Sequence, residues 1–113
     1  MIDEIVWDGF EAAKAHPNFA DGAWLTFCLM GHPDNHRSAW PEFQKLGAVN
    51  LEGEEGGFVY AKFPVSLDRS RIEQVVEKVW KLSSDADLDC SIIDLDASTD
   101  VERSKFFTLW TAG

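Results

Sequence analysis

Carboxylates are the side chains of this sequence whose number and spacing could support chemistry. Six aspartates and no basic residue lie between residues 85 and 100, and glutamates cluster at a glycine-rich segment around residue 54. The residues singled out are Glu52, Glu54, Glu55, Asp85, Asp87, Asp94 and Asp96. Gathered on a surface, such residues steer association toward a cationic partner, although the same residues could only keep the domain soluble and protect sheet edges. We expect the seven to contact Arg or Lys of a partner.

Two carboxylates that face each other in a cleft could instead perform acid–base catalysis. Asp94 and Asp96 alternate along one expected strand and are the pair placed for that role. Nothing in the sequence supplies a cleft, so no catalytic residue is predicted. The aspartate spacing also lacks the Asp-x-Asp-x-Asp-Gly loop and distal Glu of an EF-hand, so it does not predict a calcium site.

Histidines are the other metal-capable group. His32 and His36 are four residues apart, a spacing that binds one metal when both lie on a helix face. Pro33 disfavours a helix through this segment, and no third ligand is apparent, so no metal is expected. The segment is predicted to be a solvated loop in which Asp34 or Asn35 caps the next helix.

The remaining reactive groups also favour a domain without a cofactor. Cys28 and Cys90 lie in apolar stretches without a Cys-x-x-Cys spacing and are expected to be buried, reduced thiols. The glycine-rich segment 53–57 resembles a phosphate loop in its glycines, but its two carboxylates would repel a phosphate. No nucleotide or other cofactor is therefore expected.

Charge and length limit the function further. The formal net charge of −10 over 113 residues disfavours direct binding to nucleic acid or to an anionic membrane. The longest apolar run, Ala23–Met30, is far shorter than the ~20 residues of a membrane span, and no basic leader precedes it. We expect one cytoplasmic domain over residues 1–113.

Apolar periodicity predicts the elements that must position these residues. In chain order they are a helix over 2–15, a buried strand Ala23–Met30, a helix through Trp40, Phe43 and Leu46, a hairpin of Ala48–Glu52 and Gly57–Val65, a helix with the buried stripe Ile72–Leu82, a strand Leu88–Leu95 and a strand within Lys105–Trp110. Ser70 and Glu73 have the spacing of a capping box at the start of the third helix.

The central order strand, helix, strand, strand, helix, strand predicts an α+β fold. It is the order of the ferredoxin-like split βαβ sandwich, in which an antiparallel sheet carries two helices on one face. Here an N-terminal helix and a C-terminal strand would be added. The first and last of the four central strands would be neighbours, which would bring Cys28 close to Cys90. Trp24, Trp40 and Trp80 are expected in the core, and Trp7 and Trp110 partly exposed.

The segment from Trp24 to Asp96 resembles the B-type family of bacterial regulators of ribonuclease E activity. The resemblance is carried by strand Trp24–Met30, the helix end Phe43-Gln44-Lys45-Leu46-Gly47, strand Phe58–Phe63 and helix Ile72–Leu82. It implies a small acidic, ferredoxin-like, cytosolic inhibitor of a nuclease.

We therefore expect a protein-binding inhibitor or immunity-type protein that docks on a basic surface of a nuclease or another nucleic-acid-handling protein. The alternative is a small enzyme or ligand-binding domain, with a homodimer as one form. Its pocket would lie between sheet and helices and would contain His32, His36 or Cys28 beside a carboxylate. A third reading is a partner-dependent structural subunit with an apolar patch at Trp7 or Trp110.

Overall fold

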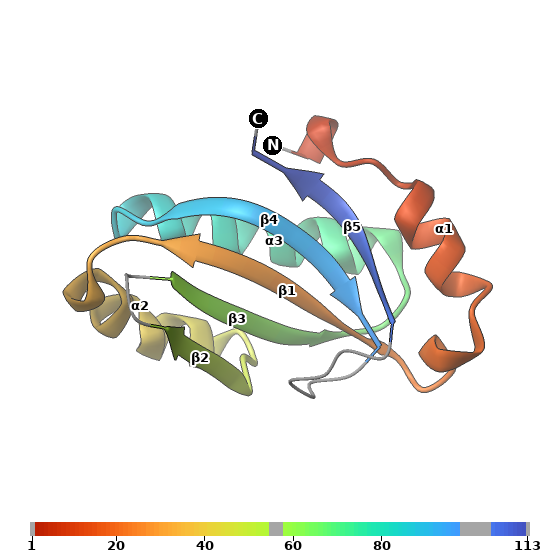
Figure 1. The fold of residues 1–113 in the computed structure, drawn as a ribbon, viewed down its shortest axis with the longest axis horizontal. Helices are drawn as coiled ribbons and strands as arrows, with labels where there is room; N and C mark the ends of the chain where they lie inside the picture. Colours follow the sequence, from red (N-terminus) through yellow and green to blue (C-terminus); the bar gives the residue numbers. More distant parts are fainter. Residues whose placement is uncertain (1, 55–57, 98–104, 113) are drawn as a thin grey trace.

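An antiparallel β-sheet forms one layer of the molecule. The computed structural model describes residues 2–54, 58–97 and 105–112, with the backbone alone at 50–54 and 58. Within these ranges the sheet has five strands in the order β2-β3-β1-β4-β5 (Figure 1). Their bounds are β1 Ala23–Met30, β2 Asn50–Glu54, β3 Phe58–Val65, β4 Asp89–Asp96 and β5 Phe106–Thr111.

Helices form the second layer. The elements are α1 Asp8–Lys14, α2 Pro33–Lys45 and α3 Arg69–Asp85, with short 3-10 turns at Ile2–Glu4 and Pro17–Phe19. Figure 1 shows α2 and α3 together on one side of the sheet, where they contact each other, while α1 contacts β5. The ring of Phe43 in α2 lies 6.0 Å from that of Phe63 in β3, which in turn lies 5.6 Å from Phe27 in β1.

The core lies between these layers. Side chains along β1 alternate between the two faces of the sheet, and those on the helix side belong to the core. Leu25, Phe27 and Leu29 are fully buried on the helix side of the sheet. Thr26 and Cys28 point to the opposite side yet are also buried. The nearly continuous apolar run of β1 thus fits a central strand that is covered on both faces.

The α+β class, the antiparallel sheet and the pairing of β1 with β4 are confirmed. The strand order is compatible with a ferredoxin-like arrangement. The hairpin strand β2 begins two residues later than predicted. A register shift between Cys28 and Leu29 marks a bulge in β4, which the prediction of a strand over Leu88–Leu95 did not include. No helix in the described part of the chain is long and apolar enough to cross a bilayer.

The predicted N-terminal helix is too long. Between the turn Ile2–Glu4 and α1, the backbone N–H of Val6 donates to the carbonyl of Leu109 at 2.9 Å. That bond to β5 interrupts the helix and leaves the Val6 side chain 56% exposed. The apolar stripe is therefore divided between Ile5 and Phe10, which are buried on separate elements.

Two predicted helix caps are wrong. Asp68, not Ser70, caps α3, since its carboxylate accepts the N–H of Ser70 at 2.9 Å. His32 caps α2 through its Nδ1 atom, and Pro33 follows as the first helical residue, where its missing N–H costs nothing. The segment at residues 32–36 is thus the start of a helix rather than a loop.

Candidate functional site

The turn between α3 and β4 places several of the predicted carboxylates at the surface. Leu88 N–H donates to the carbonyl of Ser83 at 2.8 Å, and Asp87 N–H donates to that of Ser84 at 3.1 Å. This pair of bonds is the Schellman motif that ends many helices. The motif places its penultimate residue in the left-handed region, and here Asp87 has φ 59°. Glycine is the usual residue at that position because it has no Cβ.

Replacing Asp87 by glycine is therefore expected to stabilise the fold by about 1 kcal/mol. Glycine removes the left-handed strain and also one negative charge beside a helix C-terminus. Urea unfolding of Asp87→Gly beside Asp87→Asn measures both contributions, since asparagine tolerates the conformation and removes only the charge. A less stable Asp87→Gly variant would contradict this assignment.

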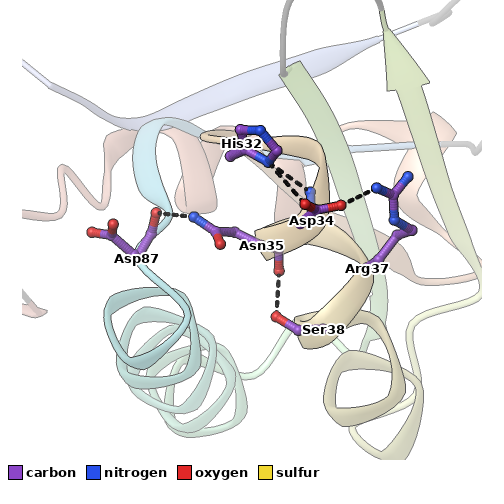
Figure 2. Close-up of polar contacts among 6 residues, drawn as sticks. All are labelled: His32, Asp34, Asn35, Arg37, Ser38 and Asp87. Atoms are coloured by element: carbon purple, nitrogen blue, oxygen red, sulfur yellow. Dashed lines mark hydrogen bonds and ion pairs between the residues drawn. The ribbon is translucent and has the colours of Figure 1, made fainter.

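The start of α2 supports this turn from the side. Asn35 donates from Nδ2 to the backbone carbonyl of Asp87 at 3.4 Å (Figure 2). Gly31 packs so closely that a Cβ there would lie 2.7 Å from Leu88 Cδ2 and 3.2 Å from the Asp87 carbonyl oxygen. In Figure 2 the Asp87 carboxylate points away from α2. The turn is held by its backbone, and its carboxylate faces solvent.

We call Asp85, Asp87 and Asp89 the acidic turn, because all three are exposed and lie within five residues of chain. The last turn of α3 contains no basic residue. The partial negative charge of a helix C-terminus therefore adds to the three carboxylates instead of being neutralised. This arrangement favours the approach of a cation.

A cavity of about 190 Å³ opens beside the acidic turn. Its lining residues are Trp80, Ser83, Ser84, Asp87, Leu88, Asp89 and Cys90. The indole of Trp80 packs edge-on against Trp110, with ring centroids 5.2 Å apart. Trp80 is partly exposed, so the prediction that it belongs to the core is only partly right. The residues that line the cavity thus include one tryptophan and two aspartates.

Cys90 lines this cavity and carries no charge at neutral pH. Burial, and to a lesser extent the neighbouring Cys28, raises the pKa of its thiol to about 12. The thiol donates to the backbone carbonyl of Ile92 at 3.6 Å. A thiol that stays protonated at neutral pH is a poor nucleophile and a poor metal ligand. Both cysteines are free thiols, and Cys28 is buried as predicted, whereas Cys90 is only partly buried.

Asp94 and Asp96 lie elsewhere, on the side of the sheet opposite α2 and α3. Asp96 is fully buried and pairs with the ammonium of Lys62 at 3.4 Å, and it accepts a hydrogen bond from Thr26. Asp94 is also buried and accepts a hydrogen bond from Thr108 at 2.9 Å. Their burial contradicts the prediction of an exposed acidic surface that includes them. They share a strand face, as predicted, but that face is packed.

The predicted glutamate cluster is described only in part. Glu52 and Glu54 belong to the backbone of β2, and Glu55 lies outside the described residues. The register pairs Glu54 with Phe58, Phe58 with Met30, and Met30 with Asp89. Glu54 and Asp89 therefore lie at one end of the sheet, three strand spacings or ~14 Å apart. The backbone thus brings Glu54 and the acidic turn to the same end of the sheet.

The histidines take structural positions. His32 caps α2 and lies 3.6 Å from Asp34, and His36 is buried. A hydrogen bond from Arg37, together with its charge, holds the pKa of Asp34 below its usual range. Among described residues, no group of three or more His, Cys, Asp or Glu converges as a metal site. Three cavities of the described part of the chain, which lie beside Cys90, Trp24 and Lys81, are not lined by His32, His36 or Cys28.

Sequence reasoning missed Asp89, Trp80 and the cavity. The available signal was helical spacing, because positions 80, 83, 84 and 87 follow the pattern i, i+3, i+4, i+7 and share one face at the end of α3. The sequence instead predicted that Trp80 lies in the core. Asp89 and Cys90, at the start of the strand after the turn, also line this cavity.

The fold and the site together define a small acidic α+β domain with an exposed acidic turn beside an aromatic cavity. Comparison of this chain with protein-family models, curated proteins and solved structures found no match.

Proposed function

We propose that this protein is a binding module that docks through the acidic turn on a basic surface of another protein. The observation that carries the proposal is the convergence of Asp85, Asp87 and Asp89 at a helix C-terminus without a basic residue. Exposed carboxylates spaced in this way steer a cationic partner and then pair with its side chains. Trp80, partly exposed beside them, has the residue type that most often anchors an interface.

The proposed partner is a nuclease or another nucleic-acid-handling protein, which the module would inhibit in the cytoplasm. Such proteins carry Lys- and Arg-rich surfaces that contact phosphates. An acidic module that covers such a surface competes with the nucleic acid for the same cations. The strand order supports a ferredoxin-like architecture for the module, which is the architecture that the sequence resemblance implies.

Charge reversal at the acidic turn tests the proposal. A fluorescein-labelled nona-arginine peptide serves as the cationic probe, and its anisotropy is measured in a salt series. The double variant Asp85→Lys/Asp89→Lys is expected to bind the peptide about tenfold more weakly than the unmodified protein, with a smaller salt dependence.

The matched control is Glu11→Lys/Asp21→Lys, which makes the same change in net charge at two exposed positions on α1 and the turn before β1. Its affinity for the peptide is expected to fall by at most about threefold, through net charge alone. Equal losses in the two double variants would show that total charge, not the acidic turn, governs association, and the proposal would then be wrong.

A further inference from the structure

Resting on the proposed function, we infer that the cavity beside the acidic turn receives one arginine side chain of the partner. The guanidinium would lie against the indole of Trp80 and donate hydrogen bonds to the carboxylate of Asp87, while the charge of Asp89 nearby would add to the attraction. The acidic turn would then be the rim of a side-chain pocket, rather than only a diffuse negative surface.

The shape of the site supports a single inserted side chain. The cavity of about 190 Å³ is bounded by the last turns of α3 on one side and by the first residues of β4 on the other. Leu88, which is buried, and the Cys90 thiol supply apolar walls for the methylene groups of a long side chain. The polar end of the cavity lies at Asp87, which is exposed.

The charge of the site favours a cation. Asp87 and Asp89 are among the residues that line the cavity, the last turns of α3 border it, and no basic residue is among its lining residues in the described chain. Ser83 Oγ is engaged with the carbonyl of Val79 at 2.7 Å, so it does not offer a donor to an anion. The Cys90 thiol, whose pKa is raised to about 12, adds neither charge nor a metal-binding thiolate.

The aromatic wall favours arginine over lysine. Trp80 is fixed by its contact with Trp110, so its indole is preorganised. A planar guanidinium can stack on an indole and still donate hydrogen bonds in its own plane, whereas a lysine ammonium is more strongly hydrated. The chain already contains one such pair, because the guanidinium of Arg69 lies 4.3 Å from the ring centroid of Trp7.

The test uses N-acetyl-arginine methylamide as the ligand and the citrulline analogue as its uncharged match. Both are titrated into ¹⁵N-labelled protein, and the indole N–H signal of Trp80 is followed by NMR after assignment with Trp80→Phe. The arginine compound is expected to shift this indole signal and the amides of Asp87 and Asp89. The lysine analogue is expected to bind more weakly, and the citrulline analogue to leave the signals in place.

Two variants complete the test. Asp87→Asn/Asp89→Asn keeps side-chain size and the left-handed turn, and is expected to weaken arginine binding at least tenfold. Glu11→Gln/Asp21→Asn, a matched neutralisation far from the cavity, should leave it unchanged. Equal shifts with citrulline, tighter binding of lysine, or unchanged affinity in Asp87→Asn/Asp89→Asn would overturn the inference. If the affinity for nona-arginine still depends on the acidic turn while the Trp80 indole signal does not shift, the docking proposal is supported and the pocket inference is wrong. If neither nona-arginine nor N-acetyl-arginine methylamide binds, both proposals are wrong.

Discussion

Replacing Lys62 by methionine is expected to lower the free energy of unfolding by about 3–5 kcal/mol. Lys62 is 4% exposed, and its ammonium lies 3.4 Å from a carboxylate oxygen of Asp96, which is fully buried. The variant keeps the length of the side chain but leaves the Asp96 charge buried without that ammonium. Loss of one member of a buried ion pair costs far more than the pair contributes in net terms. Because small domains are stable by only ~5–15 kcal/mol, the loss is large.

Urea unfolding measures this effect, and two variants control it. Lys78→Met makes the same replacement at an exposed position on α3 and is expected to change stability by less than about 0.5 kcal/mol. Lys62→Met/Asp96→Asn also removes the charge of Asp96 and is expected to recover at least ~1 kcal/mol of the loss. A loss below about 1 kcal/mol in Lys62→Met would contradict a buried, energetically coupled pair.

That pair also shows the limit of prediction from the sequence. Lys62 lies in the strongest strand pattern of the chain, where alternation would place a polar residue on a solvated face. Its ion-pair partner, Asp96, is 34 residues away in the sequence and becomes a neighbour only because β1 lies between β3 and β4 in the sheet. Local patterning predicts that β3 exists, but it cannot tell a solvated lysine from a buried one.

The elements themselves were more predictable than their ends. Apolar runs and turn residues located the strands and α-helices of the described residues, because both are local signals. The errors came from distant contacts and unusual caps. The break at Val6 depends on Leu109 of β5, and the start of α2 depends on the Nδ1 atom of His32, a cap that residue preferences do not favour.

The candidate site was likewise predicted only in part, because local sequence signals do not show which distant segments pack together. Clustering in the sequence was enough to identify Asp85 and Asp87, since a helix end followed by a turn is exposed by nature. It failed for Asp94 and Asp96, because continued strand structure carries them into a packed face. The cavity at Trp80 requires the geometry of α3 against β4, which no single segment encodes.

The thiol of Cys90 is expected to react with a disulfide about thirtyfold more slowly than an ordinary cysteine at pH 8, because a roughly thousandfold smaller thiolate fraction is only partly offset by the greater nucleophilicity of a high-pKa thiolate. In the variant Cys28→Ala, Cys90 is the only thiol, and burial, the main cause of its raised pKa of about 12, is retained. Only about one molecule in 10⁴ then carries a thiolate at pH 8, against roughly one in ten for a pKa near 9. The rate of reaction with a disulfide reagent, in native protein and in urea, measures the ratio.

The pH dependence separates this electrostatic effect from simple lack of access. If ionisation limits the rate, it should rise tenfold per pH unit beyond pH 9, where the rate of the unfolded chain levels off. A native rate that also levels off near pH 9 would mean that the pKa is ordinary and that access limits the reaction.

The raised pKa of Cys90 also makes the free energy of unfolding depend on pH. The unfolded thiol ionises near pH 9 while the folded one, with its pKa of about 12, keeps its proton, so the contribution of Cys90 to stability is full below pH 9 and is lost progressively toward pH 12. A neutral Cys90 at physiological pH is also what leaves the charge of the neighbouring cavity to Asp87 and Asp89 alone.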